Sequence, residues 1–187
     1  YSASMVTNGY LLDQNVIHTL QALKINAVQI TLDGPPKTHN SRRPDKNGRG
    51  TFDRILRNII QAADQFNIKL RMNIDQTNRS DIVKLLDILE HHQLHRKIGF
   101  YLGQTFPYTS ACTDIAGSCM TNEDFSLAGL ETLLELLDRG FAYSYWVPMG
   151  KPNVCTADKD NSFVIGPEGH IMECWNEVSE NSLATGH

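Results

Sequence analysis

Along most of the chain, hydrophobic and polar positions alternate between the spacing of strands and the spacing of helices. Segments 27–32 and 68–74 carry an apolar side chain at every second position, which is typical of a strand with one covered face. Shorter segments at 4–7 and 98–103 have the composition of strands. Apolar residues three and four positions apart predict helices between these strands. We therefore predict an α/β fold with a parallel sheet or barrel and outer helices.

The two alternating strands carry polar side chains on their second face. Buried parallel strands are usually apolar on both faces, so this face is unusual. Polar residues near the C-terminal ends of strands inside an α/β barrel are where binding sites form, whereas an edge strand with a wet face is the simpler alternative. The polar positions are Gln29, Thr31, Asp33, Arg71, Asn73 and Asp75.

A basic segment follows the strand at 27–32. Gly34-Pro35-Pro36 ends the strand, and Thr51 is the predicted N-cap of the next helix. A strand, a cationic loop with glycines and a helix N-terminus together favour an anion, because free backbone N–H groups point toward it. A solvated loop is the alternative. The cations of this predicted loop are Lys37, Arg42, Arg43, Lys46 and Arg49.

A leucine-rich segment marks a further helix, which Gly140 ends. We predict that its leucines belong to the core and that Phe141–Val147 forms another strand. Cys112 and Cys119 precede this helix and are open to three interpretations: cluster ligands, a redox pair or plain thiols. The leucines are Leu127, Leu130, Leu133, Leu134 and Leu137.

The last part of the chain predicts a β-hairpin with strands at 161–165 and 171–174. Gly166-Pro167-Glu168-Gly169 suits a type I turn followed by a bulged glycine. Cys155 precedes the hairpin and Cys174 ends it, so the fold could bring two thiolates together for a metal or cluster. Two ordinary thiols are equally compatible with this spacing.

Composition narrows the class of protein. The chain has 187 residues, a net charge of −4 and four cysteines, which argues against nucleic-acid binding and a disulfide scaffold. The sequence contains no apolar run of membrane-spanning length and no signal-peptide pattern. We therefore expect a cytoplasmic protein with no membrane partner. Because it begins at Tyr1, we expect it to be a piece of a longer chain.

Several motifs carry a family resemblance. They are Thr7-Asn8-Gly9, the segment from Gln29 to His39 with Asp33-Gly34-Pro35, then Arg43-Pro44, and Gly48-x-Gly50-Thr51-Phe52, followed by Cys155-x13-Gly169-x4-Cys174. In this order they resemble radical S-adenosylmethionine enzymes with a SPASM extension, a group that includes sulfatase maturases and other peptide-modifying enzymes. The resemblance implies a partial (β/α) barrel followed by a C-terminal β-hairpin.

The chain also departs from that family pattern. The family's Cys-x3-Cys-x2-Cys motif and the later SPASM cysteines are absent from these 187 residues. The resemblance thus implies that residues 1–147 are the C-terminal part of the barrel and 148–187 a truncated start of SPASM. We expect this piece alone to be inactive and to bind no cofactor. Its exposed sheet edge predicts self-association as a dimer, by edge pairing or by exchange of the hairpin at 155–174.

The resemblance further implies the chemistry of the intact protein. A 4Fe-4S cluster would reduce S-adenosylmethionine to a 5′-deoxyadenosyl radical, which abstracts hydrogen from a peptide or protein substrate. No acid lies in 141–154, so sulfatase maturation is no more favoured than modification of another peptide. A catalytic residue is not identified. By position the implied cofactor-binding residues are Thr7, Asn8, Thr31, Asp33, Arg43, Arg71 and Asn73, and the implied metal ligands are Cys155 and Cys174.

Two other functions compete with this hypothesis. One is a metal-independent α/β barrel lyase or aldolase that uses Lys69 or Arg71 with Asp75. The other is a non-catalytic module that binds a peptide or an anion at residues 37–50.

Overall fold

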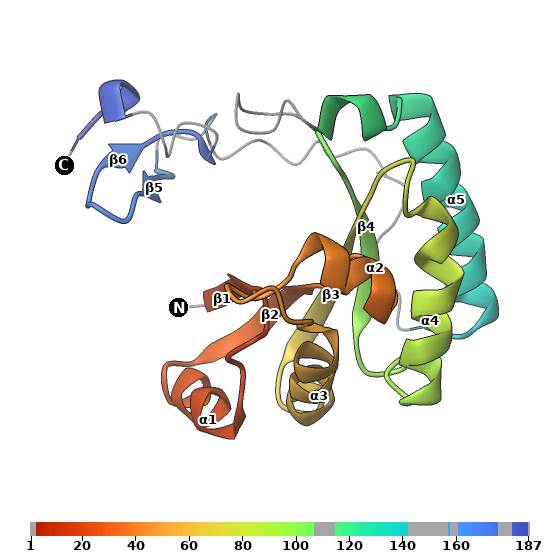
Figure 1. Ribbon diagram of the computed structural model, residues 1–187. Coiled ribbons are helices and arrows are strands. Elements are labelled where there is room, and N and C mark those ends of the chain that lie inside the picture. The colour runs from red at the N-terminus through yellow and green to blue at the C-terminus, as the bar shows by residue number, and fades with distance from the viewer. Residues whose placement is uncertain (1–2, 107–114, 142–156, 158–160, 176–180, 187) are drawn as a thin grey trace. The chain divides into compact units, whose positions relative to one another are not determined.

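The computed structural model describes residues 3–106, 115–141, 157, 161–175 and 181–186. The chain divides into two compact units, Tyr1–Tyr145 and Trp146–His187. Strands and helices alternate through the first unit (Figure 1). Its elements are β1 (Ala3–Thr7), α1 (Gln14–Ala22), β2 (Ile25–Thr31), α2 (Pro36–Arg42), α3 (Phe52–Ala62), β3 (Asn67–Ile74), the short 3-10 helix η1 (Arg79–Asp81), α4 (Ile82–His91), β4 (Gly99–Gln104) and α5 (Asn122–Asp138).

The four strands form one parallel sheet in the order β1-β2-β3-β4. In register, Thr31 of β2 lies beside Arg71 of β3, which in turn lies beside Tyr101 of β4. The predicted parallel strands and α/β fold are therefore confirmed. Parallel strands bring their C-terminal ends to one edge of the sheet, and the polar residues that end β2 and β3 meet there.

The two faces of the sheet differ as the alternation predicts. Val28, Ile30 and Leu32 are buried with the apolar residues of β3, and helices α1, α3 and α4 contribute apolar side chains to the same core. On the other face, Thr31 and Arg71 are only partly buried. The apolar core thus covers one face of the sheet, and the polar residues lie on the other face.

The basic segment at 37–50 is not a continuous loop, because it contains helix α2. Pro36 stands in its first turn, where a missing N–H costs nothing. The helix buries a single residue, His39. Thr51 is the N-cap residue of α3, as predicted, but its side chain makes no capping hydrogen bond. Oδ1 of Asn40 instead accepts hydrogen bonds from the backbone N–H groups of Thr51 and Phe52.

Helix α5 has the predicted position but not the predicted buried face. Leu127, Leu130, Leu134 and Leu137 are each about half exposed or more. The buried positions are Ala128, Thr132 and Leu136, so the leucines are not core residues as predicted. Residues 142–147 of the strand predicted at Phe141–Val147 lie outside the described residues.

The second unit contains the predicted antiparallel hairpin. Strands β5 (Val164–Ile165) and β6 (Ile171–Met172) pair with each other, and the 3-10 helix η5 (Asn181–Leu183) follows. Gly169 has φ +90°, a conformation that side chains disfavour, as expected for the glycine after the turn. Cys174 is partly buried at the end of the hairpin, whereas Cys155 lies outside the described residues.

No helix in the described part of the chain combines the length and the apolar character that a membrane span requires.

Candidate functional site

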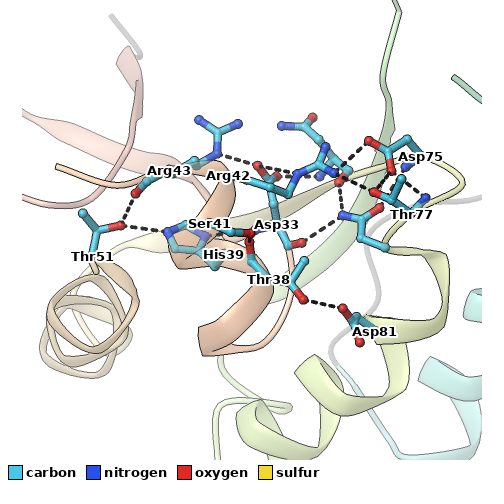
Figure 2. A network of polar contacts seen from close by, with 12 residues as sticks. Asp33, Thr38, His39, Ser41, Arg42, Arg43, Thr51, Asp75, Thr77 and Asp81 are labelled. Carbon is cyan, nitrogen blue, oxygen red and sulfur yellow. Dashed lines mark hydrogen bonds and ion pairs between the residues drawn. The ribbon is translucent and has the colours of Figure 1, made fainter. Parts of the chain in front are cut away.

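Helix α2 places two arginines above the ends of β2 and β3 (Figure 2). Asp33, which follows β2 and is 2% exposed, accepts a 2.5 Å hydrogen bond from Nε of Arg43. Its other oxygen accepts from the backbone N–H of Asn73, at 3.1 Å. Nη1 of Arg42 donates to Asp75 at 2.7 Å. Each buried carboxylate is therefore paired with a cation, which offsets the cost of burying it.

Hydrogen bonds also lower the pKa of Asp75. Burial by itself would raise this pKa, but hydrogen bonds from Thr77 and Arg42 outweigh burial and hold the pKa below its usual range. Fully buried Asn78 completes the junction, because its Nδ2 donates to the carbonyl oxygens of Asp33 and Asn73, both at 2.9 Å. The ends of the two strands are thus fixed to each other without a ligand.

His39 connects this junction to helix α3. Its Nδ1 accepts from the backbone N–H of Asp33 at 3.1 Å, and its Nε2 lies 3.1 Å from Oγ1 of Thr51. Thr51 in turn donates its hydroxyl to the carbonyl oxygen of Arg43. This chain of contacts fits a neutral imidazole with the proton on Nε2. Burial lowers the pKa of His39 to about 4, against a smaller opposing effect of Asp33.

Arg71 lies over the glycine of the neighbouring strand. A Cβ atom at Gly103 would come within 2.3 Å of Nε of Arg71, so the guanidinium occupies space that a side chain would fill. This Nε is buried and has no hydrogen-bond partner among the described residues. The hydroxyl of Thr105, just after β4, is likewise buried and unpartnered. Unpartnered buried donors are rare and costly, which points to a group that binds between them.

A cavity of about 240 Å³ is lined by both Arg71 and Thr105. Arg42 and Arg43 also line it, together with the carboxylate of Asp33. Such a donor set suits a carboxylate, which accepts charge-assisted hydrogen bonds from a guanidinium. The lining residues are Asp33, Arg42, Arg43, Arg71, Asn73, Gln104, Thr105 and Phe106.

The structure brings together some of the residues predicted for the cofactor and not others. Asp33, Arg43, Arg71 and Asn73 share the cavity of 240 Å³. Thr31 is beside Arg71 but does not line this cavity.

Thr7 and Asn8 lie away from that group. Thr7 is in register with buried Ile30 on the helix-covered face, and its hydroxyl accepts from the backbone N–H of Gly9. Asn8 lines a second, larger cavity of about 780 Å³.

Sequence reasoning missed Gly103, Gln104 and Thr105, all in or just after β4. Their position near the C-terminal end of β4 could have indicated them, since Gly103 pairs with Asn73 in the sheet. The predicted anion site at the start of α3 is not open, because Asn40 occupies two of its N–H groups. Among the described residues, no three His, Cys, Asp or Glu side chains gather at a metal-binding distance.

Comparison with known proteins finds both a similar sequence and similar solved structures. No family model matches the sequence. Fe-coproporphyrin III synthase from Methanosarcina barkeri (strain Fusaro / DSM 804) is 29% identical over 136 residues, which cover 72% of this chain and 31% of the relative. The structure of anSMEcpe with bound AdoMet and the Kp18Cys peptide matches with a TM-score of 0.73 and 18% identity, over 98% of this chain and 53% of that one. Streptococcus suis SuiB bound to S-adenosylmethionine matches with a TM-score of 0.69 and 12% identity, over 98% of this chain and 45% of SuiB.

The chain has the fold of anSMEcpe and SuiB. This fold agrees with the partial (β/α) barrel that the motif resemblance implies. The chain spans about a third to a half of the length of these proteins.

Proposed function

We propose that this chain is part of a radical S-adenosylmethionine enzyme and that its polar cavity holds the cofactor's amino-acid end. The observation that carries this proposal is that Arg71 and Thr105 line one cavity, while Nε of Arg71 and Oγ1 of Thr105 are buried without a hydrogen-bond partner among the described residues. The two solved relatives above were determined with S-adenosylmethionine, which supports the same ligand. When bound, this cofactor together with a 4Fe-4S cluster supplies hydrogen abstraction.

The contacts assign different roles to the two candidate arginines. Nε of Arg43 is already held by Asp33, whereas Nε of Arg71 has no partner. Arg71 is therefore the residue that binds the cofactor carboxylate, and Asp33 positions Arg43 beside it. Asn73 shares the cavity, and Thr31 supports Arg71 from the adjacent strand. Asn8 and Thr7 are further from the cavity, so we assign them no direct contact there.

The proposed iron–sulfur cluster ligands are cysteines that do not belong to the cofactor cavity. The Cys-x3-Cys-x2-Cys motif is not in this sequence, so the cluster that works with S-adenosylmethionine belongs to the longer protein. We propose Cys155 and Cys174 as ligands of an auxiliary cluster in that protein. The piece alone would then cleave no S-adenosylmethionine. We also propose a cytoplasmic location for the intact enzyme.

The proposed substrate is a peptide. One solved relative holds the Kp18Cys peptide and SuiB was also solved with the precursor peptide SuiA, at a TM-score of 0.68. A second candidate is a carboxylated tetrapyrrole. It is favoured by the relative named Fe-coproporphyrin III synthase, together with the apolar and basic lining of the larger cavity.

Titration of the intact enzyme with S-adenosylmethionine tests the cofactor proposal without requiring activity. Arg71→Ala should weaken binding roughly ten- to a hundred-fold, because a charge-assisted hydrogen bond is lost. Arg57→Ala removes an exposed arginine of α3 and is the matched control. Equal affinities of the parent and the Arg71→Ala variant would exclude Arg71 from the site.

A further inference from the structure

The larger cavity, here called the outer cavity, combines an apolar wall with a cationic rim. Its volume is about 780 Å³, within the range of sites for small molecules. Tyr10, Leu11 and Ile55 give it apolar surface, and Leu11 is 66% exposed. Exposed apolar surface inside a cavity favours a ligand with an apolar body.

The rim carries more positive charge than its own acid neutralises. Arg43, Lys46 and Arg49 line the cavity with one carboxylate, that of Asp45, and Arg43 is paired with Asp33. Asp45 is fully engaged, because Oδ1 accepts from the N–H groups of Asn47 and Arg49 and Oδ2 accepts from Nε of Arg49. These hydrogen bonds, chiefly that from the Arg49 backbone, hold the pKa of Asp45 below its usual range.

One cation without an ion pair among the described residues, Lys46, and the Nη atoms of ion-paired Arg43 therefore remain for a ligand. Lys46 has no ion pair or hydrogen bond with any described residue, and only Nε of Arg43 is engaged, by Asp33. An anionic group in the outer cavity would meet the ammonium of Lys46 and the Nη groups of Arg43.

Both walls of the outer cavity are fixed in advance. Nδ2 of buried Asn58, on α3, donates to the carbonyl oxygens of Gly9 and Tyr10 and so holds the turn after β1. A hydrogen bond from the hydroxyl of Thr51 to the carbonyl oxygen of Arg43 holds the other wall. Because the cavity needs no rearrangement, the free-energy cost of ordering the protein on ligand binding is smaller.

Arg43 lines the outer cavity and the cofactor cavity alike. We propose that the outer cavity binds a carboxylate group of the substrate, with the substrate's apolar part against Tyr10, Leu11 and Ile55. Lys46 is the specificity-determining cation, and Arg43 connects this subsite to the cofactor. The inference rests on the proposed function, since it assigns a substrate group to a place beside the proposed cofactor site.

Binding of paired charged and uncharged probes tests the subsite. The chain is titrated with coproporphyrin III and its tetramethyl ester, and with an apolar peptide bearing a C-terminal carboxylate or amide. We expect at least one carboxylate probe to bind about ten-fold more tightly than its neutral counterpart, and less tightly at high salt. Which pair shows the difference distinguishes a tetrapyrrole from a peptide.

Charge reversal locates the subsite. Lys46→Glu should lower the affinity for the carboxylate probe about ten-fold or more, because it replaces an attraction by a repulsion. Lys24→Glu makes the same charge change at an exposed position before β2 and should leave affinity unchanged. Equal affinity for charged and neutral probes, or equal effects of the two variants, would overturn the proposal. Affinity for S-adenosylmethionine, measured on the same samples, reports separately on the proposed function.

Discussion

Acidification should destabilise the chain through His39. This imidazole is fully buried with a pKa of about 4, whereas its ordinary pKa of 6.5 applies once the chain unfolds. Between these values the unfolded chain binds a proton that the folded chain does not. Stability from the neutral imidazole is therefore complete above pH 6.5 and decreases as the pH falls toward 4.

The two pKa values set the size of the effect. Between pH 7.5 and pH 5.0, the contribution of His39 to the free energy of unfolding should fall by about 2 kcal/mol. Asp75 and Asp81 also have lowered pKa values, but they titrate below the usual carboxyl range and contribute little at pH 5.0.

Urea unfolding at several pH values measures this loss, and a proton NMR titration of the imidazole rings assigns it. The His39 ring signals should stay those of the neutral form down to about pH 5. In His39→Asn the dependence on pH between 7.5 and 5.0 should largely disappear, whatever the variant's absolute stability. A His39 ring that titrates near 6.5 would refute the reasoning.

Other predictions follow from the same contacts. Gly103→Ala should displace the side chains of Arg71 and Asn73 and weaken S-adenosylmethionine binding about ten-fold. Gly117→Ala, where a Cβ meets nothing within 4 Å, is the control. An equal affinity of the two variants would contradict the placement of Arg71. The chain should self-associate through the edge strand β1 or its hairpin, and light scattering that finds only monomer at high micromolar concentration would disprove this. After anaerobic reconstitution the piece should form no 5′-deoxyadenosine, and turnover would mean that a cluster forms without the three-cysteine motif.

The sheet and part of the site could be predicted because period-two alternation determines which side of a strand is covered. Asp33, Arg71 and Asn73 share a cavity because they lie near the C-terminal ends of adjacent parallel strands, and position in sequence suffices for that inference. The unpartnered state of Nε in Arg71 could not be predicted, since it depends on how the guanidinium lies over Gly103.

Helix α2 escaped prediction because it lacks an apolar stripe. His39 is its one buried residue, and Pro36 in the first turn was the only local signal. Helix α5 was predicted, but its buried face was not. Its leucines indicate a helix, but their number leaves open which face is covered, and the structure covers Ala128 and Leu136 while Leu134 stays 60% exposed.

The side-chain NMR signal of Arg71 tests the central claim most directly. In a ¹H–¹⁵N spectrum of the intact enzyme, the Nε–H resonance of Arg71 should move when S-adenosylmethionine is added, because this donor gains its missing acceptor. Adenosine, which has no carboxylate, should leave that resonance in place. A resonance that stays still with S-adenosylmethionine, or that moves equally with adenosine, would contradict the proposed carboxylate site.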